Sequence, residues 1–148
     1  MEKMYEIVRI KQVVEEAKDV PYEAIVRSPE DAASITAHFI GEEDREVFFA
    51  LYLNQKNHIV AVHRVHVGTV NTCPVHPREV FKGAILSNAA SIIVAHNHPS
   101  QEVQPSPEDI EVTSRLVQAG KIIGVEVLDH LIVNASGSYT SLKEKGYV

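Results

Sequence analysis

The run EVFFALYL at residues 46–53 is the feature that most constrains how this chain can fold. It is apolar almost throughout, which is typical of a central strand covered on both faces. The segment SIIVAH at residues 91–96 has a similar character and predicts a short buried strand. Helix and strand patterns alternate around these two runs. The sequence therefore predicts an α/β (α+β) fold in which helices flank a sheet.

Three helices are expected, and two of them carry clear start signals. Ser28 and Ser106 each precede the run Pro-Glu-Asp, so each is expected to cap a helix whose first residue is proline. Gly41 and Gly124 follow as stop signals. The predicted helices span residues 28–41, 76–90 and 106–124.

The remaining strands are predicted from alternating or β-rich patterns. A polar turn between two β-rich runs indicates a hairpin that includes the apolar run 46–53. These further strands are expected at residues 4–10, 58–67, 125–133 and 138–142. We interpret residues 1–24 as an N-terminal strand and loop extension, and residues 25–148 as the main domain.

Composition narrows the class of protein. A chain of 148 residues, 45% of them hydrophobic, fits one globular domain. The single cysteine, Cys73, cannot form an internal disulfide, which predicts a cytoplasmic protein. The sequence lacks a signal-peptide pattern and a membrane-length apolar run, so no membrane association is expected. The net charge of −6 disfavours duplex-DNA binding by the whole surface, although a local basic patch would escape this argument.

Residues 95–110, AHNHPSQEVQPSPEDI, contain the strongest chemical signal. His96 closes the predicted strand and His98 follows, so both imidazoles point the same way if the segment is extended. Asp109 lies in the first turn of the next predicted helix. Two imidazoles and one carboxylate form the ligand set of a catalytic zinc site, with water in the fourth position. A His-x-His pair alone does not establish metal binding, and an ordinary helix start also explains Ser106 and Asp109.

The combined pattern of histidines, proline, serine and aspartate resembles the JAMM motif of the JAB/MPN metalloproteases. The matching residues are His96, His98, Pro99, Ser106 and Asp109. The segments HPREVFKGAILSNAASIIVAHNHPS, SPEDIEVTSRL and LDHLIV are similar to the RadC-like branch of this family. The resemblance covers roughly residues 25–148.

This resemblance implies the MPN/JAB fold, a curved mixed β-sheet flanked by helices that resembles the cytidine-deaminase-like architecture. It also implies Zn²⁺ bound by His96, His98 and Asp109. Ser106 would help to hold the substrate carbonyl or its developing oxyanion, which is compatible with a capping role. The family further requires a glutamate at the start of an upstream strand as general base, and Glu46 fits that position.

Other interpretations of the acidic residues stay open. Glu46 lies beside Arg45 and also fits a polar residue that merely opens a strand. Glu79 is the first alternative base, although the helix macrodipole already explains an acid in the first turn of a helix. Glu42 and Glu43 lie in a loop that constrains their direction less.

The other polar candidates are assigned structural roles. His130 with Asp129 is interpreted as a hydrogen-bonded pair on a strand. His76 is expected to mark a helix entry, and Cys73 to be a small buried residue, rather than to bind metal. The polar side chains of the predicted strand 58–67 are expected to alternate between its faces, so they cannot all be ligands: His63, Arg64 and His66.

Two functional hypotheses follow. The first is a zinc hydrolase of the metallopeptidase or isopeptidase type, in which a zinc-bound water attacks an amide carbonyl of a protein or peptide. The second is a RadC-like protein of DNA repair or mobile elements, acting as a nuclease or binding scaffold. An intact ligand set favours the first, and the acidic charge weakens the second. The sequence contains no helix-hairpin-helix pattern, which also weakens the second hypothesis.

Overall fold

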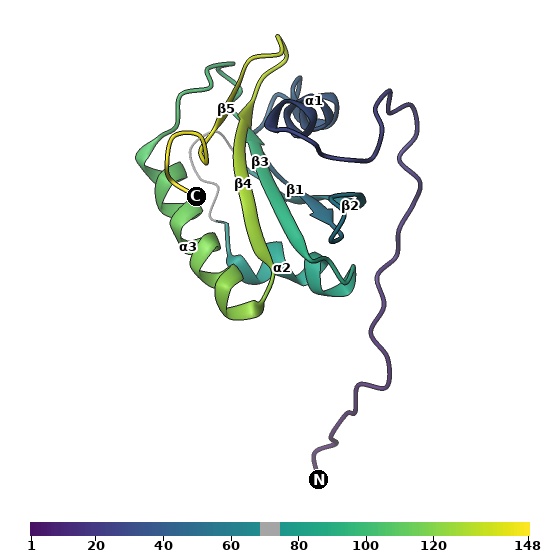
Figure 1. The fold of residues 1–148 in the computed structure, drawn as a ribbon. Helices are drawn as coiled ribbons and strands as arrows, with labels where there is room; N and C mark the ends of the chain where they lie inside the picture. Colours follow the sequence, from purple (N-terminus) through teal and green to yellow (C-terminus); the bar gives the residue numbers. More distant parts are fainter. Residues whose placement is uncertain (69–74) are drawn as a thin grey trace.

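A single five-stranded sheet forms the centre of the protein (Figure 1). The structure is a computed structural model that describes residues 1–68 and 75–148. The elements follow the order α1 (Pro29–Ile40), β1 (Val47–Leu53), β2 (Ile59–Val67), α2 (Pro77–Leu86), β3 (Ser91–Asn97), α3 (Pro107–Ile123), β4 (Glu126–Val133) and β5 (Tyr139–Ser141).

The sheet is mixed, with strand order β2-β1-β3-β4-β5. Strand β1 pairs antiparallel with β2 and with β3, while β3 and β4 are parallel and are joined through α3. Strand β5 pairs antiparallel with β4. This arrangement confirms the predicted α+β fold and the hairpin of β1 and β2, and it is consistent with the MPN/JAB fold.

Helices cover both faces of the sheet, with α1 on one side and α2 and α3 on the other (Figure 1). All seven residues of β1 are buried, as expected for a central strand. Phe49 packs in the cluster that contains Ile35 of α1. Tyr52 belongs to the opposite cluster, with Phe81 of α2 and Leu116 of α3. Alternate side chains of one strand therefore supply two separate cores.

The predicted helix signals are confirmed at most positions. Ser28 accepts a hydrogen bond from the backbone of Asp31, and Gly124 adopts a left-handed conformation, with φ of 87°, after α3. The second helix is shorter than predicted. It ends at Leu86 because the chain turns through Asn88, whose φ is 52°, before it enters β3.

The predicted strand at residues 4–10 is wrong. This segment forms no helix or strand, and Figure 1 shows it extending away from the sheet. Its apolar side chains are exposed, from 66% at Ile10 to 98% at Met4. An alternating pattern shows that a segment can pair, but not that a strand edge lies within its reach. After the side chain of Gln12 donates to Ser87 Oγ at 2.9 Å, the chain forms an antiparallel bridge with the folded body between Ile25 and His58.

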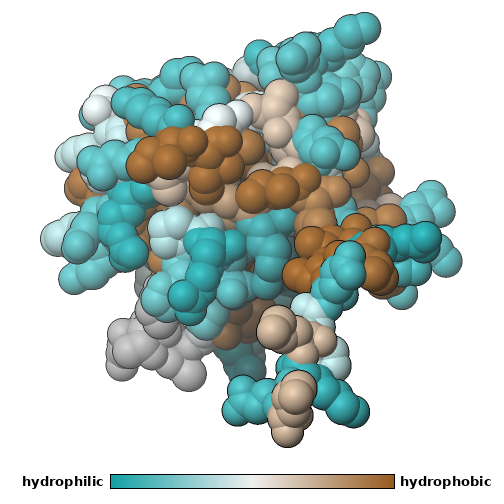
Figure 2. Space-filling view, turned by 90° about the horizontal axis from the view of Figure 1, so that it is seen from below, coloured by the Kyte–Doolittle hydropathy of each residue, from teal (hydrophilic) through white to brown (hydrophobic). Residues whose placement is uncertain are grey.

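The surface combines hydrophilic and apolar groups. Figure 2 shows, from below, apolar patches separated by hydrophilic side chains. Among the exposed apolar side chains of the folded body are Ile85 of α2 and Ile122 of α3. No helix within the described residues is long and apolar enough to cross a membrane.

Gly120 offers a test of how α3 packs against the start of β4. A Cβ atom at Gly120 would overlap the backbone oxygen of Val125. Gly120→Ala should therefore lower the free energy of unfolding by about 1–3 kcal/mol, although alanine has the higher helix propensity. Ser114→Ala, at an exposed position of the same helix, should change stability little. Urea unfolding of both variants measures the difference, and equal stability would contradict the packing described here.

Candidate metal centre

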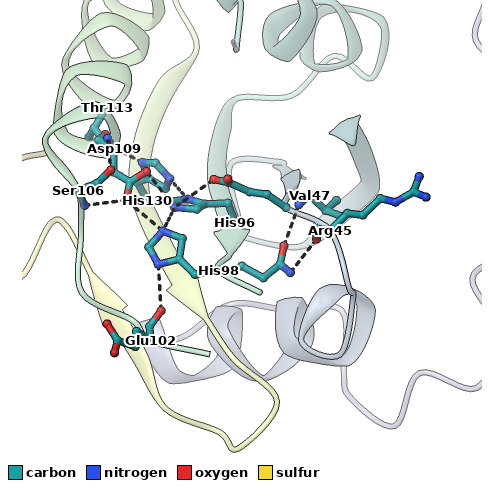
Figure 3. Close-up of polar contacts among 11 residues, drawn as sticks. Arg45, Val47, His96, His98, Glu102, Ser106, Asp109, Thr113 and His130 are labelled. Carbon is teal, nitrogen blue, oxygen red and sulfur yellow. Dashed lines mark hydrogen bonds and ion pairs between the residues drawn. The ribbon is translucent and has the colours of Figure 1, made fainter. Parts of the chain in front are cut away.

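Four side chains from separate segments converge at one end of the sheet. Glu46 lies just before β1, and His96 is the penultimate residue of β3. His98 follows the end of β3, and Asp109 lies in the first turn of α3. One ligand atom from each of the four lies within 4.8 Å of the others. Figure 3 shows the imidazoles of His96 and His98 beside the carboxylate of Asp109. The structure thus brings together the residues that the sequence motif singled out.

Three of the four ligand atoms lie closer together than the fourth. The Nε2 atoms of His96 and His98 are 3.0 Å apart. Asp109 lies 3.1 Å from His96 Nε2 through Oδ1 and 3.2 Å from His98 Nε2 through Oδ2. Glu46 Oε1 is 4.0 Å from His96 Nε2. The geometry therefore separates a compact set of two histidines and one aspartate from a more distant glutamate.

Hydrogen bonding explains how His98 presents its ligand atom. Its Nδ1 lies 2.9 Å from the backbone oxygen of Glu102. A carbonyl oxygen only accepts, so Nδ1 carries a hydrogen and Nε2 of the neutral ring holds a lone pair. That lone pair faces His96 and the carboxylate of Asp109. Electron-rich atoms crowded in this way repel one another unless a cation lies between them, so the donor set fits a metal ion.

Asp109 is positioned by the start of α3. Ser106 Oγ accepts the backbone N–H of Asp109 at 3.1 Å, and Asp109 Oδ2 accepts the backbone N–H of Ser106 at 2.9 Å. This reciprocal pair is a capping box. Burial raises the pKa of Asp109, but its contacts with the imidazoles of His96 and His98 and with the N–H of Ser106 outweigh burial and hold this pKa well below its usual range. The carboxylate that caps the helix therefore stays ionised.

Glu46 is held in place by the neighbouring backbone. Asn97 accepts the N–H of Val47 at 2.8 Å through Oδ1 and donates to the backbone oxygen of Arg45 at 3.0 Å (Figure 3). The peptide on each side of Glu46 is thus fastened to the end of β3. Burial raises the pKa of the Glu46 carboxyl, and the nearby imidazole of His96 opposes this rise.

The alternative acids lie elsewhere. Glu79 forms an ion pair with Lys82 at 2.8 Å, and Glu43 forms one with Arg64 at the same distance. Neither belongs to the metal-binding group found among the described residues. Of the four acids considered for the role of base, only Glu46 lies beside the two histidines of the motif.

The other candidates from the sequence occupy different environments. His63 contacts the hydroxyl of Tyr52 at 3.2 Å, and a bulge of β2 interrupts simple alternation between Arg64 and His66. His76 precedes α2 as its N-cap residue, as expected. Cys73 lies outside the described residues.

The predicted hydrogen bond between Asp129 and His130 is present, but it uses the backbone N–H of His130, which donates to Asp129 Oδ1 at 2.7 Å, and not the His130 ring. Adjacent residues of a strand point to opposite faces, so the two side chains separate. Asp129 accepts from Ser141 Oγ at 2.7 Å, whereas the His130 ring contacts His96 Nδ1 at 2.8 Å and Thr113 Oγ1 at 2.6 Å. Full burial lowers the pKa of His130 well below its ordinary value.

Two residues near the site were not identified from the sequence. Asn97 continues a buried strand between the two motif histidines, and Thr113 lies one helical turn after Asp109. Both are polar and fully buried. Thr113 could have been identified from the sequence by two signals. It is a polar residue at a helix position expected to be buried, and it lies four residues after a candidate ligand.

Comparison with known proteins agrees with this geometry. Residues 26–147 match the family described as RadC-like JAB domain. The chain belongs to this family. Similar proteins include a UPF0758 protein of Desulforudis audaxviator, 50% identical over 125 residues, which are 84% of this chain and 54% of the relative. The UPF0758 protein ABC2615 of Shouchella clausii is 51% identical over 123 residues, or 83% of this chain and 53% of the relative.

A third relative, the UPF0758 protein BcerKBAB4_4299 of Bacillus mycoides, is 52% identical over 123 residues, covering 83% of this chain and 54% of its own length. The chain thus spans about half the length of the curated relatives that it matches. These names describe no activity. What the comparisons establish is a RadC-like JAB domain, which here contains a group of residues able to hold a metal ion.

The protonation of His98 predicts how metal binding depends on pH. Its hydrogen bond to Asp109 raises the pKa of His98 above the usual value, and burial opposes this effect only in part. A proton on Nε2 blocks a metal ligand, so affinity should be highest above the raised pKa. Affinity should then fall as the pH drops through it, beginning above the ordinary histidine value of about 6.5. Zinc titrations across this range measure the effect, and an affinity independent of pH would contradict it.

Proposed function

We propose that this domain is a zinc-dependent hydrolase that cleaves an amide bond, as a metallopeptidase or isopeptidase. The main support is the compact set of two imidazoles and one carboxylate, with a glutamate just outside it. Catalytic zinc sites commonly have three protein ligands and leave one position for water or substrate. A structural zinc site would more often have four protein ligands.

The spacing of the ligand atoms supports zinc. Zn–N and Zn–O bonds of about 2.0–2.1 Å in a tetrahedron place neighbouring ligand atoms about 3.3 Å apart. The Nε2 atoms of His96 and His98 are 3.0 Å apart, and each lies 3.1–3.2 Å from a carboxylate oxygen of Asp109, Oδ1 for His96 and Oδ2 for His98. Zinc bound there would polarise a substrate carbonyl and lower the pKa of a water molecule to about 7. The proposal assigns the three residues as ligands.

Glu46 is proposed as the general base. Its carboxylate lies too far from His96 Nε2, at 4.0 Å, to belong to the compact ligand set, yet close enough to reach a water molecule beside it. In this role Glu46 accepts a proton from the attacking water and later donates it to the leaving amine. Burial raises its pKa, which brings the carboxyl closer to the range where it can do both.

Ser106 is proposed to stabilise the developing oxyanion. Its Oγ already accepts the N–H of Asp109, and a hydroxyl group still has its own hydrogen to donate. A substrate oxygen near Asp109 can accept that hydrogen. Capping and catalysis therefore use different parts of the same hydroxyl group.

The substrate class is also a proposal. An amide bond in a protein or peptide fits the JAB chemistry, and the lone cysteine fits a cytoplasmic location. The hypothesis of a nuclease or DNA-binding scaffold predicts cleavage or binding of phosphodiester substrates instead. A panel of fluorogenic peptides, ubiquitin-like isopeptide conjugates and single- and double-stranded DNA, assayed with zinc-loaded protein, distinguishes these hypotheses. Cleavage of DNA alone would overturn the peptidase proposal.

Glu46→Gln tests the assignment of the base. The amide keeps the size of the side chain but cannot accept the proton, so amide hydrolysis should fall by about 100-fold or more. Zinc content should stay near that of the parent protein, as measured by elemental analysis. Asp109→Ala is the comparison, because loss of a ligand should remove zinc and activity together. Full activity in Glu46→Gln would refute its role as base, and loss of zinc would show that Glu46 is itself a ligand.

Ser106→Asp separates capping from catalysis. Aspartate is a competent N-cap, so the free energy of unfolding should change little. The variant places negative charge where the oxyanion forms and removes the hydroxyl donor, so turnover should fall strongly. Ser106→Thr keeps both the cap and the hydroxyl and should retain most activity. Unchanged turnover in Ser106→Asp would reduce Ser106 to a capping residue.

A further inference from the structure

A buried chain of hydrogen bonds connects two of the proposed ligands behind the metal-binding group. Thr113 Oγ1 lies 2.7 Å from the backbone oxygen of Asp109 and 2.6 Å from His130 Nδ1. His130 Nε2 lies 2.8 Å from Nδ1 of His96 (Figure 3). Thr113 and His130 have no exposed surface, and His96 is 1% exposed. The ring of Phe48 packs against both histidines.

The direction of the first two hydrogen bonds follows from simple chemistry. The backbone oxygen of Asp109 can only accept, so the hydroxyl of Thr113 donates its one hydrogen there. Thr113 Oγ1 must then accept in its contact with His130. It follows that Nδ1 of His130 carries a hydrogen.

The remaining hydrogen bond determines the state of His96. A fully buried imidazole whose partners are a hydroxyl and a second imidazole is held neutral, so His130 has no hydrogen on Nε2. That atom therefore accepts, and Nδ1 of His96 donates. Neutral His96 is left with its lone pair on Nε2. This is the atom that faces His98 and Asp109.

We propose that Thr113 and His130 are positioning residues that hold His96 in the tautomer able to bind metal through Nε2. The proposal depends on the metal site proposed above but not on its hydrolytic activity. The chain of hydrogen bonds also connects two of the proposed ligands, because it starts at the backbone of Asp109 and ends on the ring of His96. An imidazole suits the middle position, since it donates from one nitrogen and accepts at the other.

The two ligand histidines are thus oriented by different means. His98 lies after β3 and donates to a backbone oxygen, that of Glu102. His96 lies within the sheet, where β1 and β4 already pair with the backbone of β3. Its second nitrogen therefore needs a side chain as partner, and the neighbouring strand β4 supplies His130. Outer partners of metal-binding histidines commonly affect metal affinity by about 10- to 100-fold.

A matched pair of variants at Thr113 tests the proposal. Thr113→Val removes the hydroxyl, so Nδ1 of His130 loses its acceptor and can no longer keep its hydrogen without cost. His130 is then free to place the hydrogen on Nε2 and donate to His96, which reverses the tautomer of His96. Thr113→Ser keeps the hydroxyl. We expect zinc affinity to fall about 10-fold or more in Thr113→Val and to stay near the parent value in Thr113→Ser.

Nitrogen-15 NMR of histidine-labelled, metal-free protein at alkaline pH, where the rings are neutral, gives a second readout. Parent protein and Thr113→Ser should show His96 with its hydrogen on Nδ1, and Thr113→Val should show the other tautomer or a mixture. A purely structural role predicts a change in unfolding free energy without a change in tautomer or relative affinity, and that result would overturn the proposal. So would a hydrogen on Nε2 of His96 in the parent.

A second pair of variants guards against misfolding. His130→Gln offers both a donor and an acceptor and should retain more zinc affinity than His130→Leu, which offers neither. Equal affinity in these two folded variants would count against the proposal. If the parent showed the expected tautomers but bound no zinc, the proposed metal site would be refuted, while the hydrogen-bonded arrangement of Thr113, His130 and His96 would be confirmed. The two hypotheses are therefore tested separately.

Discussion

The pairing of β1 with β3 is the constraint on which the site depends. It places Phe48 opposite His96, so the segment just before β1 lies beside the end of β3. Asn97 accepts the N–H of Val47 and thereby fixes where β1 begins, which brings Glu46 near the histidines. Strand side chains alternate, so a slip of one residue would turn His96 away from α3 and expose both cores to polar groups. Burial of both faces of the sheet therefore maintains the geometry of the site.

The start of α3 adds Asp109, the third proposed ligand, to this frame, and it does so with a structure that also stabilises the helix. The capping box between Ser106 and Asp109 satisfies two backbone N–H groups that the helix leaves unpaired. The same carboxylate contacts His96 and His98. One short motif thus combines a helix start with a side chain of the group able to hold a metal ion, which is why an ordinary helix start and a functional site could not be distinguished by pattern alone.

The elements and the residues of the metal-binding group could be predicted because local signals determine them: apolar runs, caps and the spacing of the motif. Predictions failed where the outcome depends on distant partners. Residues 4–10 alternate like a strand but find no edge to pair with. Asp129, the neighbour of His130 in sequence, accepts only the backbone N–H of His130, whereas the partners of its ring are Thr113 and His96, which tertiary packing supplies. A pattern reports which face a side chain occupies, but not what lies opposite it.

The environments of the two carboxylates support the different roles proposed for them. Asp109 contacts two imidazoles and accepts the N–H of Ser106, which hold its pKa low and keep its carboxylate ionised, as the proposed ligand role requires. Glu46 is buried beside the site with fewer donors, and burial raises its pKa. A bound cation lowers the pKa of both, but more for the group that it contacts directly. Two acids in one site can thus differ in proton affinity, and the one that holds protons more readily is suited to carry them.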